Sequence, residues 1–265
     1  MLTRGRHANH AWLQVENSDT HVAPVDPALR QPATAVQLLE TVIARDEAPA
    51  SATTLLREAD EPALLLGPAV TCYVDAITYA AEHHLPAGVK GVIDTAGAKH
   101  GLDQADAWPT LRSHLMLVAA NGHDPVEVVN QAVALGPLDR ARDRAAVIDY
   151  RLDVTRANNR TRGPLPWLPG IPVQLLDDPT WKTYLSGRYQ LTRQLADETR
   201  HRAPADTPRW AQDLYGLDPA LVADIQQWRA AHQTPDTDLR PTGAPEHSPA
   251  ERDTQRHLDH ALETS

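Results

Sequence analysis

Five dipeptides in which a capping side chain precedes proline constrain the fold of this chain more than any other feature. They are Asp124-Pro125, Asp178-Pro179, Thr207-Pro208, Asp218-Pro219 and Ser248-Pro249. The side-chain oxygen accepts a hydrogen bond from a free amide of the first helical turn, and proline fits the first helical position because it has no N–H to leave unpaired. Glutamate follows three residues after two of these caps, at Glu127 and Glu251, which is the pattern of a capping box. Each pair therefore predicts the start of an α-helix.

From Thr34 onward, apolar residues recur at the three- and four-residue spacing of a helix face, as Val36, Leu39 and Ile43 do. The predicted helices cover residues 34–47, 51–60, 68–85, 88–99, 107–121, 124–135, 142–156, 178–202, 208–214, 218–232 and 249–262. Residues 107–121 are apolar around most of the helix, so we expect them near the centre of a bundle. The apolar run HAWLQV at residues 10–15 is the one convincing strand candidate.

Proline-rich stretches suggest how the chain is divided. Residues 17–33 contain three prolines, and residues 157–176 contain four prolines around Trp167, so neither stretch can be one helix. We expect an N-terminal segment at 1–16, a linker at 17–33, a helical domain at 34–156, a proline-rich loop and helical hairpin region at 157–232, and a polar strap with a terminal helix at 233–265. The predicted fold class is mainly α, a multi-helix bundle with one short N-terminal strand.

Composition excludes several classes of protein. The chain has 265 residues, of which 42% are hydrophobic, and this is enough to bury a core. The single cysteine, Cys72, excludes an internal disulfide framework and a cysteine-rich zinc module. No run approaches the ~18 consecutive apolar residues of a membrane helix, and the net charge of -10 disfavours binding of a polyanion by the chain as a whole. We therefore expect a cytoplasmic protein.

Histidines offer no convincing metal site in the sequence. His83 and His84 are adjacent, so on a helix they point about 100° apart and cannot share an ion. His257 and His260 are three residues apart, but no constellation of carboxylates or cysteines joins them. We predict no metal site.

The first residues carry the most specific motif. Leu2-Thr3-Arg4-Gly5-Arg6 is followed at once by the candidate strand HAWLQV. This arrangement resembles motif VI of superfamily 1 helicases, in which an arginine reaches the terminal phosphate of the nucleotide across the cleft between two motor domains. Arginine suits that task because its planar guanidinium makes paired bonds to phosphate oxygens. The resemblance implies that the strand belongs to a RecA-like helicase domain.

The rest of the chain is similar to the C-terminal region of MobF-type conjugative relaxase-helicases. The similar segments are residues 44–70, 107–133, 146–153, 163–185 and 222–262. The resemblance implies that Arg4 acts as an arginine finger within a complete motor, and that Thr3, Arg4 and Arg6 bind nucleotide there. It also implies ATP and Mg²⁺ as cofactors of the full-length relative, with none in this chain, and motor domains and transfer-machinery proteins as partners.

Two features of that family are absent from the sequence. No phosphate-binding loop of the GxxxxGK[ST] type is present, because Lys90, Lys99 and Lys182 all lack the preceding glycine. The N-terminal relaxase tyrosine and the three-histidine metal site of the family do not occur here either. We therefore expect the chain to be the non-catalytic tail of a longer protein, which arose as a gene remnant, a mis-called start or a split product.

An alternative function rests on the one locally basic run. Its arginines are Arg140, Arg142, Arg144, Arg151, Arg156, Arg160 and Arg162. Arginines can contact the phosphate backbone of DNA while Trp167 or Trp181 stacks on a base. The candidate DNA contacts are Arg156, Arg160 and Arg162. In the competing interpretation the run is a solvated helix face paired with nearby aspartates.

Overall fold

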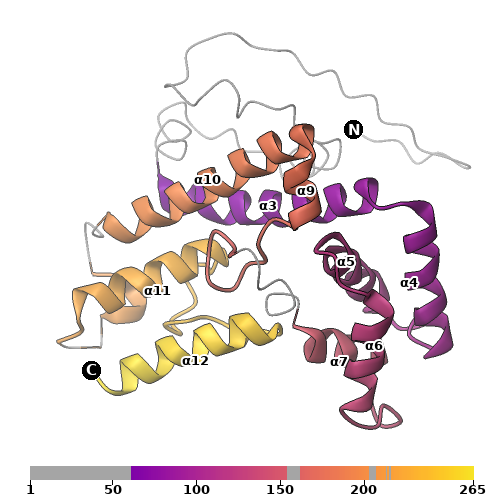
Figure 1. Ribbon diagram of the computed structural model, residues 1–265. Helices are drawn as coiled ribbons and strands as arrows, with labels where there is room; N and C mark the ends of the chain where they lie inside the picture. Colours follow the sequence, from indigo (N-terminus) through magenta and orange to yellow (C-terminus); the bar gives the residue numbers. More distant parts are fainter. Residues whose placement is uncertain (1–60, 154–161, 203–206, 213, 215) are drawn as a thin grey trace, which may run out of the picture. The chain divides into compact units, whose positions relative to one another are not determined.

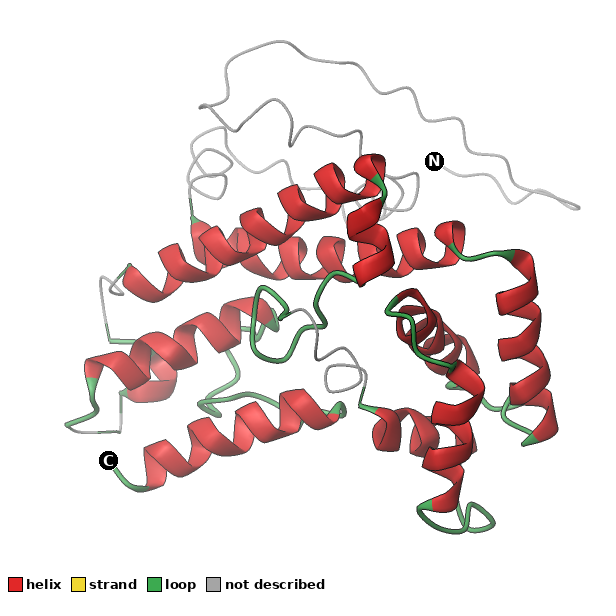
Figure 2. Cartoon of the chain, viewed as in Figure 1, coloured by secondary structure: helices red, strands yellow, loops and turns green. Residues whose placement is uncertain are grey.

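Helices and the loops between them make up the part of the chain that the computed structural model describes, namely residues 61–153, 162–202, 207–212, 214 and 216–265 (Figure 2). Within these residues the only β-type pairing is an isolated bridge between Arg162 and Pro169. The prediction of a mainly α fold is therefore confirmed. The candidate strand HAWLQV, the linker 17–33 and the predicted helices 34–47 and 51–60 lie outside the described residues.

The helical elements follow the predicted order closely (Figure 1). They are α3 (Pro62–His84), α4 (Ala87–Lys99), α5 (Trp108–Ala120), α6 (Pro125–Ala134), α7 (Arg144–Leu152), α9 (Val173–Asp177), α10 (Pro179–His201), the 3₁₀ helix η2 (Arg209–Ala211), α11 (Pro219–Ala231) and α12 (Pro249–Glu263). Residues 57–265 form one compact unit.

Four of the five predicted caps are made. Asp124, Asp178 and Asp218 accept hydrogen bonds from first-turn amides of α6, α10 and α11, and Ser248 does the same for α12. The proline of each pair occupies the start of its helix. The Ser248 hydroxyl also donates to the Glu251 carboxylate at 2.6 Å. The two side chains of the predicted capping box are therefore bonded to each other. These helices begin where the sequence places them because the cap and the proline act within one turn.

Several features differ from the prediction. Thr207-Pro208 caps no α-helix, and only η2 follows it. The third helix starts at Pro62, six residues before the predicted residue 68, because exposed Pro68 lies inside α3, where solvent can hydrate the unpaired carbonyl one turn earlier. Glu127 bonds to Gln131 instead of completing a capping box.

Two further differences occur around α7 and α10. The predicted helix 142–156 begins at Arg144 and ends at Leu152, because Asp143 caps it and Asp153 adopts a left-handed conformation. The short helix α9 precedes α10 within the stretch that was expected to be irregular.

The core forms around α3, which packs against α10, α11 and α5. Its buried face carries Leu66, Tyr73 and Ile77, each without solvent exposure. All six residues from Leu115 to Ala120 of α5 are buried, together with Leu111. The expectation that residues 107–121 lie at the centre of the bundle is confirmed.

Helix α3 is long and apolar enough to cross a membrane, judged by length and composition alone. This contrasts with the sequence-based expectation that no stretch qualifies. A helix at the centre of a protein core has the same composition, and the contacts of α3 with α5, α9, α10 and α11 place it in such a core.

Candidate functional site

Most residues predicted to carry function lie outside the described part of the chain. These are Thr3, Arg4 and Arg6 of the motif VI-like segment, and Arg156 and Arg160 of the basic run. Arg162 is described, and it is an exposed residue that lines a wide groove in the described part of the chain.

That groove has a volume of about 990 Å³ and lies between α10, α11, the start of α12 and the loop 162–168. Its charged lining consists of three arginines and four aspartates: Arg162, Arg193, Arg200, Asp153, Asp197, Asp224 and Asp253. Arg200 and Asp224 form an ion pair across the groove, and this hydrogen bond raises the pKa of Arg200. A lining with more carboxylates than guanidinium groups does not favour the phosphate backbone of a nucleic acid.

The described part of the basic run is used partly for structure. The Arg151 guanidinium donates to the carbonyls of Ala132 and Gly136, at 3.0 and 2.9 Å, and so satisfies the C-terminal end of α6. Arg140, Arg142 and Arg144 are exposed. One of the seven arginines is therefore committed to a helix terminus.

A second polar region joins α11 to α12 through the strap, residues 233–248. Buried Arg229 lies at its centre and makes four hydrogen bonds to strap carbonyls, those of Pro235, Asp238, Arg240 and Pro241, at 2.7 to 3.3 Å. Burial lowers the pKa of Arg229, although nearby aspartates act in the opposite direction. The backbone of the strap is therefore arranged around the guanidinium of Arg229.

Two further side chains fix the strap from the helices on either side. Trp228 of α11 donates through Nε1 to the Thr242 carbonyl at 2.9 Å. Gln255 of α12 donates to the Ala244 carbonyl at 2.8 Å and accepts from the Glu246 amide at 3.0 Å. The backbone of Glu246 is therefore fixed immediately before α12 begins.

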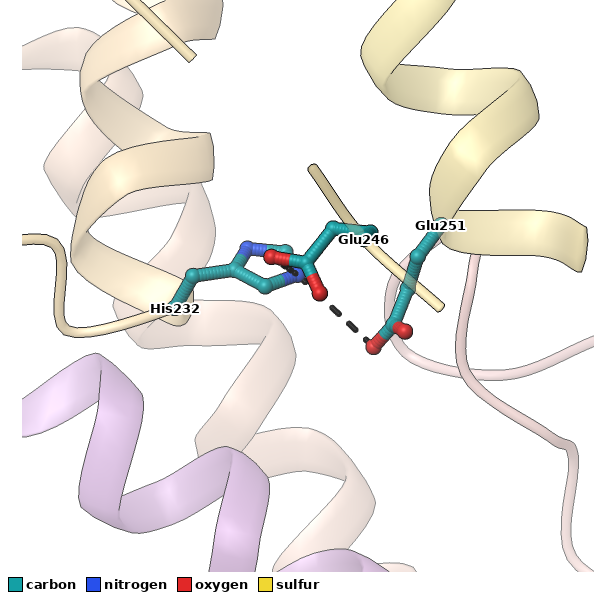
Figure 3. A group of neighbouring side chains, drawn as sticks. All are labelled: His232, Glu246 and Glu251. Carbon is teal, nitrogen blue, oxygen red and sulfur yellow. Dashed lines mark ion pairs between the residues drawn. The ribbon is translucent and has the colours of Figure 1, made fainter. Parts of the chain in front are cut away.

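Three ligand-type side chains converge at this point: His232 at the end of α11, Glu246 in the strap and Glu251 in the first turn of α12 (Figure 3). His232 Nε2 lies 3.9 Å from Glu246 Oε1 and 3.7 Å from Glu251 Oε1. This nitrogen is buried and has no hydrogen-bond partner within the described part of the chain. One ligand atom from each residue lies within 4.8 Å of the other two.

The surroundings fix the histidine ring and one of the carboxylates. His232 Nδ1 lies 2.9 Å from the Trp228 carbonyl, which can only accept, so Nδ1 carries a proton. The imidazole packs on Trp228 with ring centroids 3.8 Å apart. Glu251 accepts the Ser248 hydroxyl through Oε2, which leaves Oε1 facing the histidine. Nε2 is therefore the nitrogen presented to the two carboxylates.

The charges of the cluster shift the acidities of its members. Burial works against a charged His232, but the interactions with Glu251, the Trp228 carbonyl and Glu246 outweigh it and raise the pKa of His232. Burial raises the pKa of Glu246. For Glu251 burial also acts upward, but the interactions with His232 and Ser248 prevail and lower its pKa.

Sequence reasoning missed this cluster. The histidine pairs considered there are used differently: His84 faces Asp178 at 3.9 Å, and His260 is an exposed residue near Glu263. Residues 232, 246 and 251 are separated by 14 and 5 positions, which match no metal-binding motif. The only local signal was the capping pattern at Ser248, which places Glu251 in the first turn of α12.

Comparison with known proteins adds no relative. No family model, no curated protein and no solved structure matches this chain.

Proposed function

We propose that this chain is the C-terminal helical segment of a conjugative DNA relaxase-helicase, where it packs on the motor, contacts transfer partners and catalyses no reaction itself. The observation that carries the proposal is the sequence Leu2-Thr3-Arg4-Gly5-Arg6 followed by HAWLQV, which resembles motif VI and the last strand of a RecA-like motor domain. A mainly helical body after this segment fits such a role.

In this proposal Arg4 completes the nucleotide site of a motor whose phosphate-binding loop lies on another segment. Thr3 and Arg6 support the same site. ATP and Mg²⁺ bind to the complete protein, which acts in plasmid transfer in the cytoplasm. The guanidinium of Arg4 neutralises charge that develops on the transferred phosphoryl group, a contribution worth about 10³- to 10⁵-fold in rate where such arginines act.

The test is complementation. A MobF-type relaxase-helicase truncated just before motif VI is mixed with the purified chain, and DNA-stimulated ATP hydrolysis is measured. We expect the chain to bind the truncated motor and restore turnover. Arg4→Ala should abolish turnover without abolishing binding, whereas Arg30→Ala in the predicted linker serves as the matched control. ATP hydrolysis by the chain alone, or failure to bind the truncated motor, would overturn the proposal.

The alternative function, a DNA-binding module built on the basic run, can be tested with the same purified chain. A DNA-binding module predicts salt-dependent affinity for DNA that is lost on substitution of Arg156, Arg160 and Arg162. The mixed charge of the groove beside Arg162 and the structural use of Arg151 argue against it. Fluorescence anisotropy with labelled DNA measures this affinity directly.

A further inference from the structure

We propose that His232, Glu246 and Glu251 form a binding site for a divalent transition-metal ion that fastens the strap between α11 and α12. The proposal is independent of the relaxase-helicase assignment, because it rests on residues and contacts within 228–255 alone (Figure 3).

The distances in the cluster suit a metal ion better than a direct hydrogen bond. Charge-assisted N–H···O bonds are about 2.7–2.9 Å long, so a proton on His232 Nε2 has no carboxylate oxygen within bonding reach at 3.7 and 3.9 Å. Ligand atoms around tetrahedral zinc, with bonds of about 2.0–2.2 Å, lie about 3.4 Å apart. The two histidine–carboxylate distances, 3.9 and 3.7 Å, exceed that separation by about 0.5 and 0.3 Å.

The histidine is prepared as a ligand. Nδ1–H donates to the Trp228 carbonyl, and this is the outer-shell bond that fixes the tautomer and leaves the Nε2 lone pair available to a metal. Tilted packing against Trp228 and against Trp167, whose ring centroid lies 5.5 Å away, sets the direction of the ring. This arrangement leaves Nε2 buried and without a hydrogen-bond partner among the described residues.

The two carboxylates differ in how they are held, and both arrangements suit coordination. Glu251 is oriented by the Ser248 hydroxyl, a second outer-shell bond. Glu246 is held through its backbone amide by Gln255, so its side chain can turn toward the ion. Two carboxylates and a neutral imidazole carry a charge of -2, which a divalent cation neutralises.

The donor set indicates the class of metal. One imidazole and two carboxylates suit Zn²⁺ or Mn²⁺, whereas Ca²⁺ takes six to eight oxygen ligands and Mg²⁺ keeps an octahedral shell rich in water. Three protein ligands leave a position for water. Because the ligands come from the end of α11, the strap and the start of α12, the ion links three elements that are otherwise joined through Arg229, Trp228 and Gln255.

The test uses the full chain freed of metal by a chelator. Isothermal titration with ZnCl₂ and, separately, MnCl₂ should show one site that Glu246→Gln or Glu251→Gln weakens by at least about tenfold. The double variant His257→Ala/His260→Ala, which removes exposed histidines of α12, should bind like the wild type. At the same concentration, zinc should also raise the melting temperature of the wild type and of the histidine double variant more than that of Glu246→Gln.

Glutamine keeps the shape of both side chains, and circular dichroism verifies that the variants stay helical. The proposal is overturned if the wild type binds neither ion, if Glu246→Gln and Glu251→Gln bind as the wild type does, or if Mg²⁺ or Ca²⁺ displaces zinc at equal concentration. Loss of zinc binding in the His257→Ala/His260→Ala variant alone would likewise overturn it, by placing the ion elsewhere.

Discussion

Two regions of the described body are built on different principles. Where α3 packs against α5 and α10, the interior is mainly apolar, with Leu66, Ile77 and Leu115 free of solvent contact. Where the strap joins α11 to α12, the interior contains a guanidinium, an indole N–H and an amide, each bonded to strap carbonyls. In Figure 1 the apolar region lies along α3, and the polar one lies between α11 and α12.

The contrast shows how each region achieves a unique structure. Apolar side chains attract one another without direction, so the α3 region depends on volume and tolerates swaps that conserve it. Hydrogen bonds are directional, and a buried carbonyl left unpaired costs about 1–3 kcal/mol. The strap region should therefore be sensitive to geometry even when charge and size are nearly conserved.

The largest effect is expected from a cavity in the apolar region. Leu115→Ala should lower the free energy of unfolding by about 3 kcal/mol, because Leu115 is fully buried at the centre of the bundle. Leu115→Met, which conserves volume, should cost less than about 1.5 kcal/mol. Denaturant unfolding measures both. Leu135→Ala is the control, since Leu135 is 70% exposed and its loss should change stability by less than about 0.5 kcal/mol.

The sharpest test of the comparison is Arg229→Lys. The four strap carbonyls are bonded by both terminal nitrogens of Arg229, and a lysine ammonium cannot reproduce that fork. We expect a loss of about 2 kcal/mol in unfolding free energy, more than Leu115→Met, although the charge is retained. Arg209→Lys, at an exposed position, serves as the control. If Arg229→Lys costs no more than Leu115→Met, the distinction between the regions fails.

The same contrast explains how much the sequence predicted. The starts of α6, α10, α11 and α12 were predicted to within a residue, because the cap and proline act inside one turn. The apolar character of residues 107–121 was enough to place α5 at the centre. These signals are local and repeat with the helical period.

What the sequence did not reveal depends on partners far apart along the chain. The residues around Arg229 do not indicate that it will bond to carbonyls up to 12 positions away. Every residue has a backbone carbonyl, so the sequence does not show which ones will accept a bond. The cluster of His232, Glu246 and Glu251 likewise exists only after Gln255 and Trp228 have folded the strap. The start of α3 was missed because Pro68 is a helix-start signal in the sequence yet lies inside the helix.

A smaller effect is expected from one of the polar bonds within the mainly apolar region. The buried Tyr73 hydroxyl of α3 donates to the Pro169 carbonyl at 2.8 Å, across 96 positions of sequence. Burial, with a contribution from Tyr189, raises the pKa of this hydroxyl, so it remains a donor at ordinary pH. Tyr73→Phe should lower the unfolding free energy by about 1 kcal/mol by leaving the carbonyl unpaired.

Tyr79→Phe is the matched control for Tyr73→Phe. Tyr79 lies on the same helix but is 56% exposed, so its change should stay within about 0.5 kcal/mol. Both variants are measured by thermal unfolding. Equal losses of unfolding free energy in Tyr73→Phe and Tyr79→Phe would mean that the bond to Pro169 does not stabilise the protein. The α3 region would then depend on apolar packing even more strictly than proposed.

The smallest expected effect concerns a polar contact that water can reach. Asp143 caps α7 by accepting from the Ala146 amide and also accepts from the Ala107 amide, each at 2.8 Å. These bonds lower the pKa of Asp143 in the folded protein. A depressed carboxyl pKa adds stability above the unfolded value of about 3.9, and that stability is lost as the pH falls through the folded pKa.

The free energy of unfolding of Asp143→Asn should therefore decrease less than that of the wild type as the pH falls below about 4. At neutral pH the variant should be less stable by under about 1 kcal/mol, because the contact is partly solvated and asparagine still caps a helix. Urea unfolding at several pH values gives both quantities, and Asp139→Asn at an exposed position supplies the reference. A loss as large as that of Arg229→Lys would show that accessibility to water does not separate the two kinds of polar contact.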